Sequence, residues 1–330
     1  MIKHKYIKLF SNCIPVSGVH KSAIYDLQRS QVIDIPNDLY DFIQLFDKNC
    51  VSEIFDLCGS QNKEIVEEYI DFLQKEELIF FMDPEEKRLF PELNMRWDCP
   101  SKISNAIIEI SDVTHPHISK TMRFLEELGC GHLYIKILIN DSLSVIHEIV
   151  EVLKDSSVFS VVFEIKYNTQ ENISDYVTLA EDNRRIETIF LISDTEHTIE
   201  SKKVIIASPE SFINRKECYF NINITLFTEA KKYNTYFNRK LCIDYRGFIK
   251  NAPETPETFG NIENISQEQL IEVINSKMFR KYWKVHKDII SECRDCEYRY
   301  MCVDNRLPQL SENGDYFFST SCDIKNGVVV

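Results

Sequence analysis

Glycine is scarce in this chain. Only eight glycines occur in 330 residues, and no two of them lie in a G-x-G-x-x-G or G-x-x-x-x-G-K arrangement. Loops that hold nucleotide phosphates need glycine, because only a bare backbone brings its N–H groups close to the ligand. The sequence therefore argues against a P-loop or a Rossmann nucleotide site.

The chain also lacks long apolar runs, and its net charge is not positive. No stretch approaches the roughly 18 consecutive apolar residues of a membrane helix, and residues 1–13 are partly basic without a continuous apolar run. The formal net charge of -14 disfavours broad binding to nucleic acid phosphates. We expect a cytoplasmic protein with protein or peptide partners, no membrane span and no nucleic acid ligand.

Residues 1–83 indicate a small α+β unit. The β-rich runs 5–16 and 22–36 flank the turn "SGVHK" and predict a hairpin. Three amphipathic helical patterns follow between residues 36 and 78, and a short strand covers 79–83. This order predicts a winged helix-turn-helix. Because its helices are rich in Asp and Glu, a peptide-binding role is favoured over nucleic acid binding.

A polar, proline-marked linker covers residues 84–102, and the pattern then changes. Over 103–235, short β-branched runs alternate with amphipathic helices, which predicts a parallel sheet of about six strands whose last strand spans 219–227. A complete barrel needs about 250 residues, so we predict an open or partial TIM-like (β/α)6 barrel. Residues 236–330 form a last, turn-rich segment with a helix predicted over 267–288.

Cysteine is abundant, with 11 in the chain. Cys293 and Cys296 form a Cys-x2-Cys pair, Cys302 follows five residues later, and Cys322 is the last cysteine. A Cys-x2-Cys turn aims two thiolates at one metal. In a reducing compartment such spacing indicates metal ligands more than disulfides. Four thiolates suit either zinc or an iron–sulfur cluster, and spacing alone does not choose between them.

The stretch "CRDCEYRYMCVDNR" at 293–306 stands after "CIDYRGFIKN" at 242–251 and "FGNI" at 259–262, and before Cys322. This order resembles the SPASM domain that follows the partial barrel of radical S-adenosylmethionine peptide-modifying enzymes. It is most similar to the SPASM-domain peptide maturases of grasp-with-spasm systems. The resemblance is close over residues 236–330 and rests on domain order elsewhere.

The resemblance implies a single auxiliary 4Fe–4S cluster. Its ligands would be four cysteines: Cys293, Cys296, Cys302 and Cys322. A second cluster of the family is not expected, because only Cys242 matches its ligand pattern. Ala252 and Arg306 stand where further cysteines are usual. Cys242 is then expected to be a buried thiol.

The cofactor-cleaving motif of radical S-adenosylmethionine enzymes is missing. The loop after the first predicted barrel strand reads "SDVTHPHIS" at 111–119 and contains no cysteine, and "INDSLS" at 139–144 replaces a glycine-rich loop. We therefore expect no cleavage of S-adenosylmethionine. The chain resembles peptide maturases but is expected to be an accessory pseudo-enzyme, and whether any chemistry takes place on it stays open.

The resemblance also implies partners. In this architecture the winged-helix module binds the leader of a ribosomally made precursor peptide, and an ATP-grasp ligase forms the new bonds. The leader would add as a strand to the hairpin edge. Candidate contacts are Ile24, Tyr25, Leu27, Val32 and Ile33. The alternatives are a zinc-stapled interaction scaffold and a redox-active maturase; the oligomeric state, a homodimer included, stays open.

Overall fold

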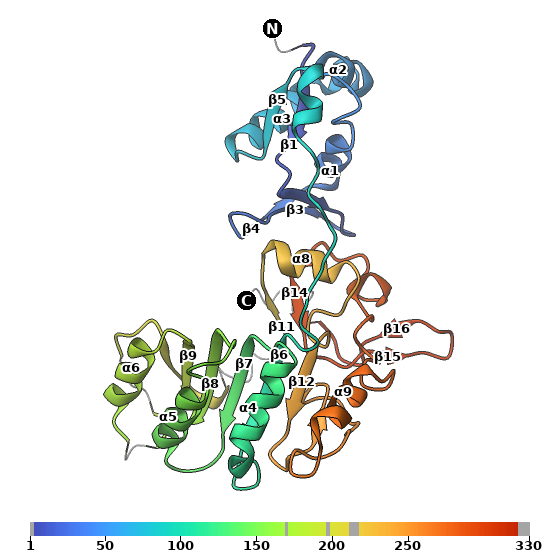
Figure 1. Ribbon diagram of the computed structural model, residues 1–330. Helices are drawn as coiled ribbons and strands as arrows, with labels where there is room; N and C mark the ends of the chain where they lie inside the picture. Colours follow the sequence, from blue (N-terminus) through green and yellow to red (C-terminus); the bar gives the residue numbers. More distant parts are fainter. Residues whose placement is uncertain (1–2, 169–170, 196–198, 211–217, 323–330) are drawn as a thin grey trace.

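The computed structural model describes residues 3–168, 171–195, 199–210 and 218–322. A seven-stranded, mostly parallel sheet with helices forms the large body of this mixed α/β protein. The N-terminal module, which comprises the described residues up to Asp83, projects from that body at the top of Figure 1.

The N-terminal module contains two small antiparallel sheets. Its strands are β1 (Tyr6–Leu9), β2 (Cys13–Val16), β3 (Ser22–Asp26), β4 (Gln31–Ile35) and β5 (Ile79–Met82). β2, β3 and β4 pair in that order, whereas β1 pairs with β5. The β-rich run 22–36 is thus two strands, because the Asp26 carboxylate accepts hydrogen bonds from the N–H groups of Gln28 and Arg29 and turns the chain.

The three predicted helices of the module are confirmed. They are α1 (Asn37–Ile43), α2 (Val51–Cys58) and α3 (Lys63–Lys75), followed after β5 by the 3-10 helix η2 (Pro84–Leu89). Their apolar residues recur at helical spacing and are buried in one cluster: Leu39, Phe42, Ile43, Val51, Ile54, Val66, Ile70 and Leu73. The cluster also takes in Ile24 of β3, so the helices cover one face of the three-stranded sheet.

The large sheet has the order β10-β9-β8-β7-β6-β12-β13. Its strands are β6 (Asn105–Ile110), β7 (His132–Ile137), β8 (Ser160–Lys166), β9 (Ile186–Ile192), β10 (Val204–Ala207), β12 (Lys240–Ile243) and β13 (Ile249–Lys250). Neighbouring strands are parallel except β13, which is antiparallel to β12. β10 and β13 end the order, so the sheet is open within the described residues.

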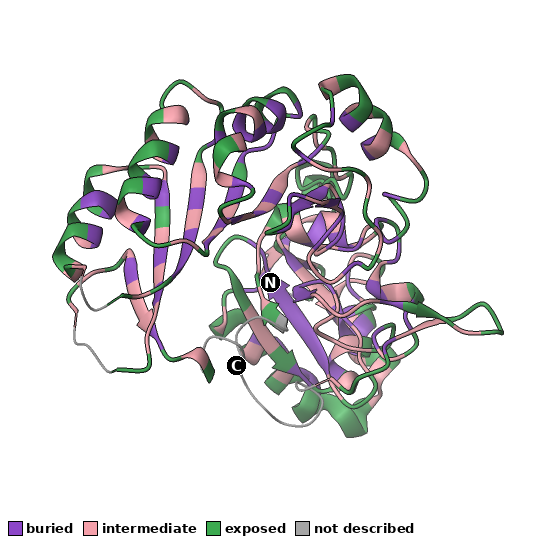
Figure 2. Cartoon of the chain, turned by 90° about the horizontal axis from the view of Figure 1, so that it is seen from below, coloured by how far each residue is buried: buried purple, intermediate pink, exposed green. Residues whose placement is uncertain are grey.

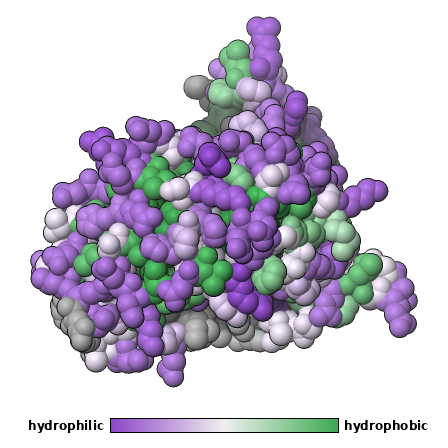
Figure 3. Space-filling view, turned by 60° about the horizontal axis from the view of Figure 1, so that its bottom comes forward, coloured by the Kyte–Doolittle hydropathy of each residue, from purple (hydrophilic) through white to green (hydrophobic). Residues whose placement is uncertain are grey.

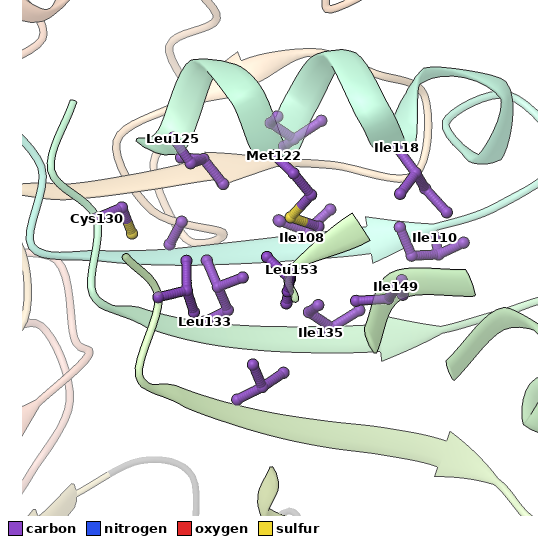
Figure 4. Packing of buried hydrophobic residues seen from close by; sticks show 14 of the residues in the cluster. Ile108, Ile110, Ile118, Met122, Leu125, Cys130, Leu133, Ile135, Ile149 and Leu153 are labelled. Atoms are coloured by element: carbon purple, nitrogen blue, oxygen red, sulfur yellow. The ribbon is translucent and has the colours of Figure 1, made fainter. Parts of the chain in front are cut away.

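Helices that pack on this sheet include α4 (Ile118–Glu127), α5 (Ser142–Val152) and α6 (Ile173–Asp182). Alternate residues along the strands are buried, as the colour changes in Figure 2 show. Figure 4 shows Met122 of α4 over Ile108 of β6, and Ile135 of β7 beside Ile149 and Leu153. Each such fully buried side chain stabilises the fold by about 1.5–3 kcal/mol, and this cluster is the main core.

The strand predicted at 219–227 is wrong. Only β11 (Cys218–Phe220) is extended, and it pairs with β14 (Cys302–Asp304) outside the large sheet. The predicted strand residues from Ile224 onward belong instead to helix α8 (Ile224–Ala230). The Asn223 side chain accepts a hydrogen bond from the Leu226 N–H at 2.8 Å and so caps this helix. The sixth parallel strand is instead β12, so the large sheet continues past the predicted boundary at 235/236.

The helix predicted over 267–288 is shorter, since α9 is Gln267–Asn275. Ser276 is extended, and the Arg280 Nε donates to the Ile274 carbonyl at 2.7 Å, which satisfies an acceptor at the helix end. Beyond it lie η4 (Lys287–Ile289) and the hairpin of β15 (Gln309–Leu310) and β16 (Tyr316–Phe317).

The "CIDYRGFIKN" stretch is a hairpin, as expected. β12 and β13 pair through Cys242 with Lys250, and the turn needs Gly247, which has φ +81°.

The face seen in Figure 3 is mostly hydrophilic, with hydrophobic side chains in small groups. Within the described ranges, no helix has the length and apolar character needed to cross a membrane.

Candidate metal centre

Four cysteines of the C-terminal segment line one small cavity. They are Cys293, Cys296, Cys302 and Cys322. The cavity has a volume of about 20 Å³, which is room for about one water molecule. The remaining lining residues are Lys287, Glu292, Tyr298, Arg299, Asp304 and Arg306.

Local turns aim the cysteines at this cavity. We call residues 293–302 the cysteine loop. The Cys296 N–H donates to the Cys293 carbonyl at 2.9 Å, and the Cys302 N–H donates to the Tyr298 carbonyl at 3.2 Å. These tight turns reverse the chain between the thiols. Cys302 then begins β14, and Cys322 follows β16.

Arg306 holds the segment that carries Cys322. Its Nη1 donates to the carbonyls of Thr320 at 2.8 Å and Ser321 at 3.0 Å. The sequence showed Arg306 only as a departure from the SPASM ligand pattern. In the structure the arginine at this position ties Cys322 to the wall of the cavity.

The cavity wall carries charged side chains of both signs. Lys287 Nζ and Arg306 Nη2 lie 2.8 and 2.6 Å from the same Asp304 Oδ2. The side chains of Lys287 and Asp304 are only 7% and 0% exposed, and that of Arg306 is 15% exposed. The buried Lys287 and the half-buried Arg306 thus share the Asp304 carboxylate, and Glu292 is a second carboxylate on the cavity wall.

Burial favours the neutral thiol at Cys293. Burial raises the pKa of Cys293 to about 12, although Lys287 and Arg306 lower it. A metal would change this, because ligating thiols are deprotonated and four thiolates around one divalent ion carry net negative charge.

The arrangement of the side chains is not that of a closed metal site. No three His, Cys, Asp or Glu side chains of the described residues lie together as they would around a metal ion. The donor set nevertheless fits a thiolate-bound zinc ion or iron–sulfur cluster. The four cavity cysteines are the residues that would hold it.

The predicted peptide contacts divide into two groups. Ile24 and Tyr25 lie on β3, the central strand, and both are 0% exposed. Leu27 is buried as well. These three side chains have no surface on which a peptide could lie, so the prediction is corrected there. Val32 and Ile33 lie half-buried on β4, which is an edge strand.

Cys242 and Ala252 do not line the cavity. Cys242 is fully buried on β12, between Ile107 of β6 and Lys250 of β13. Burial raises its pKa above the ordinary value. Ala252 is also fully buried.

The loop that would carry the radical S-adenosylmethionine cysteines is closed by hydroxyl groups instead. The Thr114 hydroxyl donates to the Glu109 carbonyl at 2.7 Å and accepts from the Ser111 N–H at 2.8 Å. The Ser111 hydroxyl donates to the Tyr245 carbonyl at 2.5 Å. The backbone and hydroxyl groups of this loop therefore bond to one another and to the β12–β13 hairpin.

A second polar group was missed by the sequence reasoning. On the large sheet, Lys136 Nζ lies 3.5 Å from Glu164 Oε1, and the Tyr134 hydroxyl donates to Glu164 Oε2 at 2.7 Å. These residues are neighbours only through the β7–β8 register. The alternation of polar and apolar residues in β7 was the one available signal.

The chain matches no protein-family model, and no curated protein matches it either.

Proposed function

We propose that this chain is a metal-stapled, peptide-binding accessory protein in the maturation of a ribosomally made, post-translationally modified peptide. The N-terminal module binds the precursor leader, and an ATP-grasp ligase forms the new bonds. The chain itself does not cleave S-adenosylmethionine. The observation that carries the proposal is that the four motif cysteines line one cavity.

The N-terminal module supports the peptide-binding part. A three-stranded sheet with helices on one face fits a winged-helix peptide-binding module. β4 ends the strand order, so its outer side can accept an added strand. Val32 belongs to the cluster beneath the sheet, whereas Ile33 packs toward the helices. A leader strand beside β4 would likewise send alternate side chains to these two faces.

An iron–sulfur cluster and a zinc ion are the two candidate metal groups for the cysteine site. The resemblance to SPASM domains implies a 4Fe–4S cluster. Four thiolates suit either a single ion or a cluster, and the cavity volume does not choose between them. Zinc held by four thiolates would make the chain a stapled interaction scaffold, which is the second candidate function.

Metal analysis tests the site. Iron, labile sulfide and zinc are measured on protein purified without oxygen, with a visible spectrum. We expect about four irons or one zinc per chain. The Cys293→Ser/Cys296→Ser variant should lose the metal, whereas Cys99→Ser should keep it, since Cys99 lies outside the cavity. Wild-type protein that contains neither iron nor zinc would contradict the proposal.

Hydrogen exchange tests the peptide edge. Synthetic leader peptides of the grasp-with-spasm type are added to the full-length protein, and amide exchange is compared on the two outer strands of the same sheet. We expect slower exchange in β4 and no change in β2. Absence of binding, or protection confined to other elements, would argue against leader capture at β4.

A further inference from the structure

The three-stranded sheet of the N-terminal module rests on α8 and the cysteine loop. Figure 1 shows this sheet directly above α8. One buried cluster joins the two parts: Val16, Ala23, Tyr25 and Leu27 from the module, with Phe227, Ala230, Tyr300 and Met301 from the body. Half of the body's contribution therefore comes from residues between Cys296 and Cys302.

The polar contacts are concentrated in the same loop. The Tyr25 hydroxyl donates to the Glu297 carbonyl at 2.7 Å, and Arg299 Nη1 donates to the Ser17 carbonyl at 2.7 Å. The Val19 N–H donates to the Asp295 carbonyl at 3.1 Å. Consecutive parts of the cysteine loop thus form hydrogen bonds with the β2–β3 hairpin.

The cysteine loop also reaches the edge strand. The Tyr298 hydroxyl donates to the Asp34 carboxylate of β4, at 2.7 Å from Oδ1. Lys21 Nζ lies 2.6 Å from Asp34 Oδ2 and 5.1 Å from the centre of the Tyr298 ring. The strand proposed to receive the leader is therefore in contact with a residue that lines the cysteine cavity.

Little regular structure fixes the loop itself. It consists of turns from Cys293 until β14 begins at Cys302. Its path thus depends on its side-chain anchors, and three of these are cavity thiols. A metal bound only by the folded loop would stabilise that path by its binding free energy.

We propose that metal binding at the cysteine site controls the docking of the N-terminal module on the body of this chain. This inference rests on the proposed function. The metal-bound loop presents Glu297, Tyr298 and Arg299 in the geometry that holds the β2–β4 sheet. Loss of the metal releases the sheet, and with it the orientation of the β4 edge toward a partner ligase.

The test is hydrogen exchange on the full-length chain, as purified and after metal removal by chelation, with the metal content measured on each sample. We expect amides in residues 13–35 to exchange about tenfold faster without metal. Protection in β6–β8 should stay unchanged, which establishes that the body remains folded. The Cys293→Ser/Cys296→Ser variant should reproduce the metal-free pattern.

A second variant separates docking from metal binding. Tyr25→Phe removes only the hydroxyl that donates to Glu297, so it should keep the full metal content and still exchange a few-fold faster in residues 13–35. If the metal is bound but its removal does not change this exchange, the inference is overturned and the proposal of a metal site is kept. A chain without any bound metal would overturn both proposals.

Discussion

Among single residues, Glu229 of α8 has a carboxyl group whose ionised form is disfavoured by burial. Its Oε1 accepts a hydrogen bond from Asn238 Nδ2 at 2.7 Å. Arg239 and Lys240 favour the ionised form, yet burial outweighs them and raises the pKa of Glu229 from 4.5 to about 7. The folded chain therefore binds a proton more tightly here than the unfolded chain does.

This shift fixes the sign of a pH dependence. Between pH 4.5 and about 7, the native state holds more protons at Glu229, so the free energy of unfolding falls as pH rises through this range. Glu229→Gln keeps an acceptor for Asn238 without the charge. We expect it to raise the unfolding free energy by about 2 kcal/mol at pH 8 and very little at pH 5.

Chemical denaturation of wild type and Glu229→Gln at the two pH values measures this difference. Glu272→Gln, on an exposed position of α9, is the control and should leave the profile unchanged. An equal gain at both pH values would show that the charge of Glu229 is not the cause.

Cys242 gives a second prediction for a single residue. Because it is buried on β12 and does not line the cysteine cavity, Cys242→Ala should retain the full metal content. The small void should lower the free energy of unfolding by about 1 kcal/mol. Metal analysis and thermal unfolding measure the two effects, and loss of metal would place Cys242 among the ligands.

Residue spacing selected four cysteines that line one cavity, but it did not show what surrounds them. Cys293, Cys296, Cys302 and Cys322 were selected from the sequence, and the structure brings them to one cavity. The pairing of Lys287 with Asp304 could not be predicted, since it depends on how η4 packs against β14. Ion pairs between distant segments have no periodic signature in the sequence.

At the scale of elements, hydrophobic periodicity was informative where burial is one-sided. β6 to β10 and α4 to α6 all fall on predicted patterns because each has a buried face. The pattern failed at 219–227, where Asn223 caps a helix inside an apparently alternating run. It also could not reveal that β12 pairs with β6, because strand order is a tertiary property.

The central strands give a prediction for the core. Ile135 of β7 is 0% exposed, whereas Leu138, just beyond the same strand, is 48% exposed. Ile135→Ala should lower the free energy of unfolding by about 2–5 kcal/mol, and Leu138→Ala should change it by less than about 0.5 kcal/mol. Denaturation curves of the two variants compare them directly, and similar losses would contradict the packing described for β7.

For the whole molecule, the linker between the module and the body is extended but anchored. Residues 91–102 contain no helix or strand. The Trp97 ring lies 5.0 Å from that of Tyr233 and 5.5 Å from the Arg239 guanidinium. Arg239 also donates a hydrogen bond to the Ser101 carbonyl. The sequence predicted a linker here, but it could not show that Trp97 binds the linker to the body.

Removal of the Trp97 ring should therefore loosen the linker. We expect Trp97→Ala to speed cleavage within residues 91–102 by about tenfold in limited proteolysis, because the anchored backbone must open before a protease can act. Met95→Ala, in the same segment and partly exposed, is the matched control. Cleavage at the same rate in both variants would mean that Trp97 does not anchor this segment.

The neighbouring positions of β6 and β12 have a consequence for synthesis of the chain. Ser104 and Arg239, which hydrogen-bond beside these strands, are 135 positions apart. On the ribosome, β6 must wait for its second partner until nearly all of the sheet has emerged, and its edge is unpaired meanwhile. Such an edge recruits other strands, so a chain interrupted before residue 240 should aggregate, whereas one that extends past β13 should not.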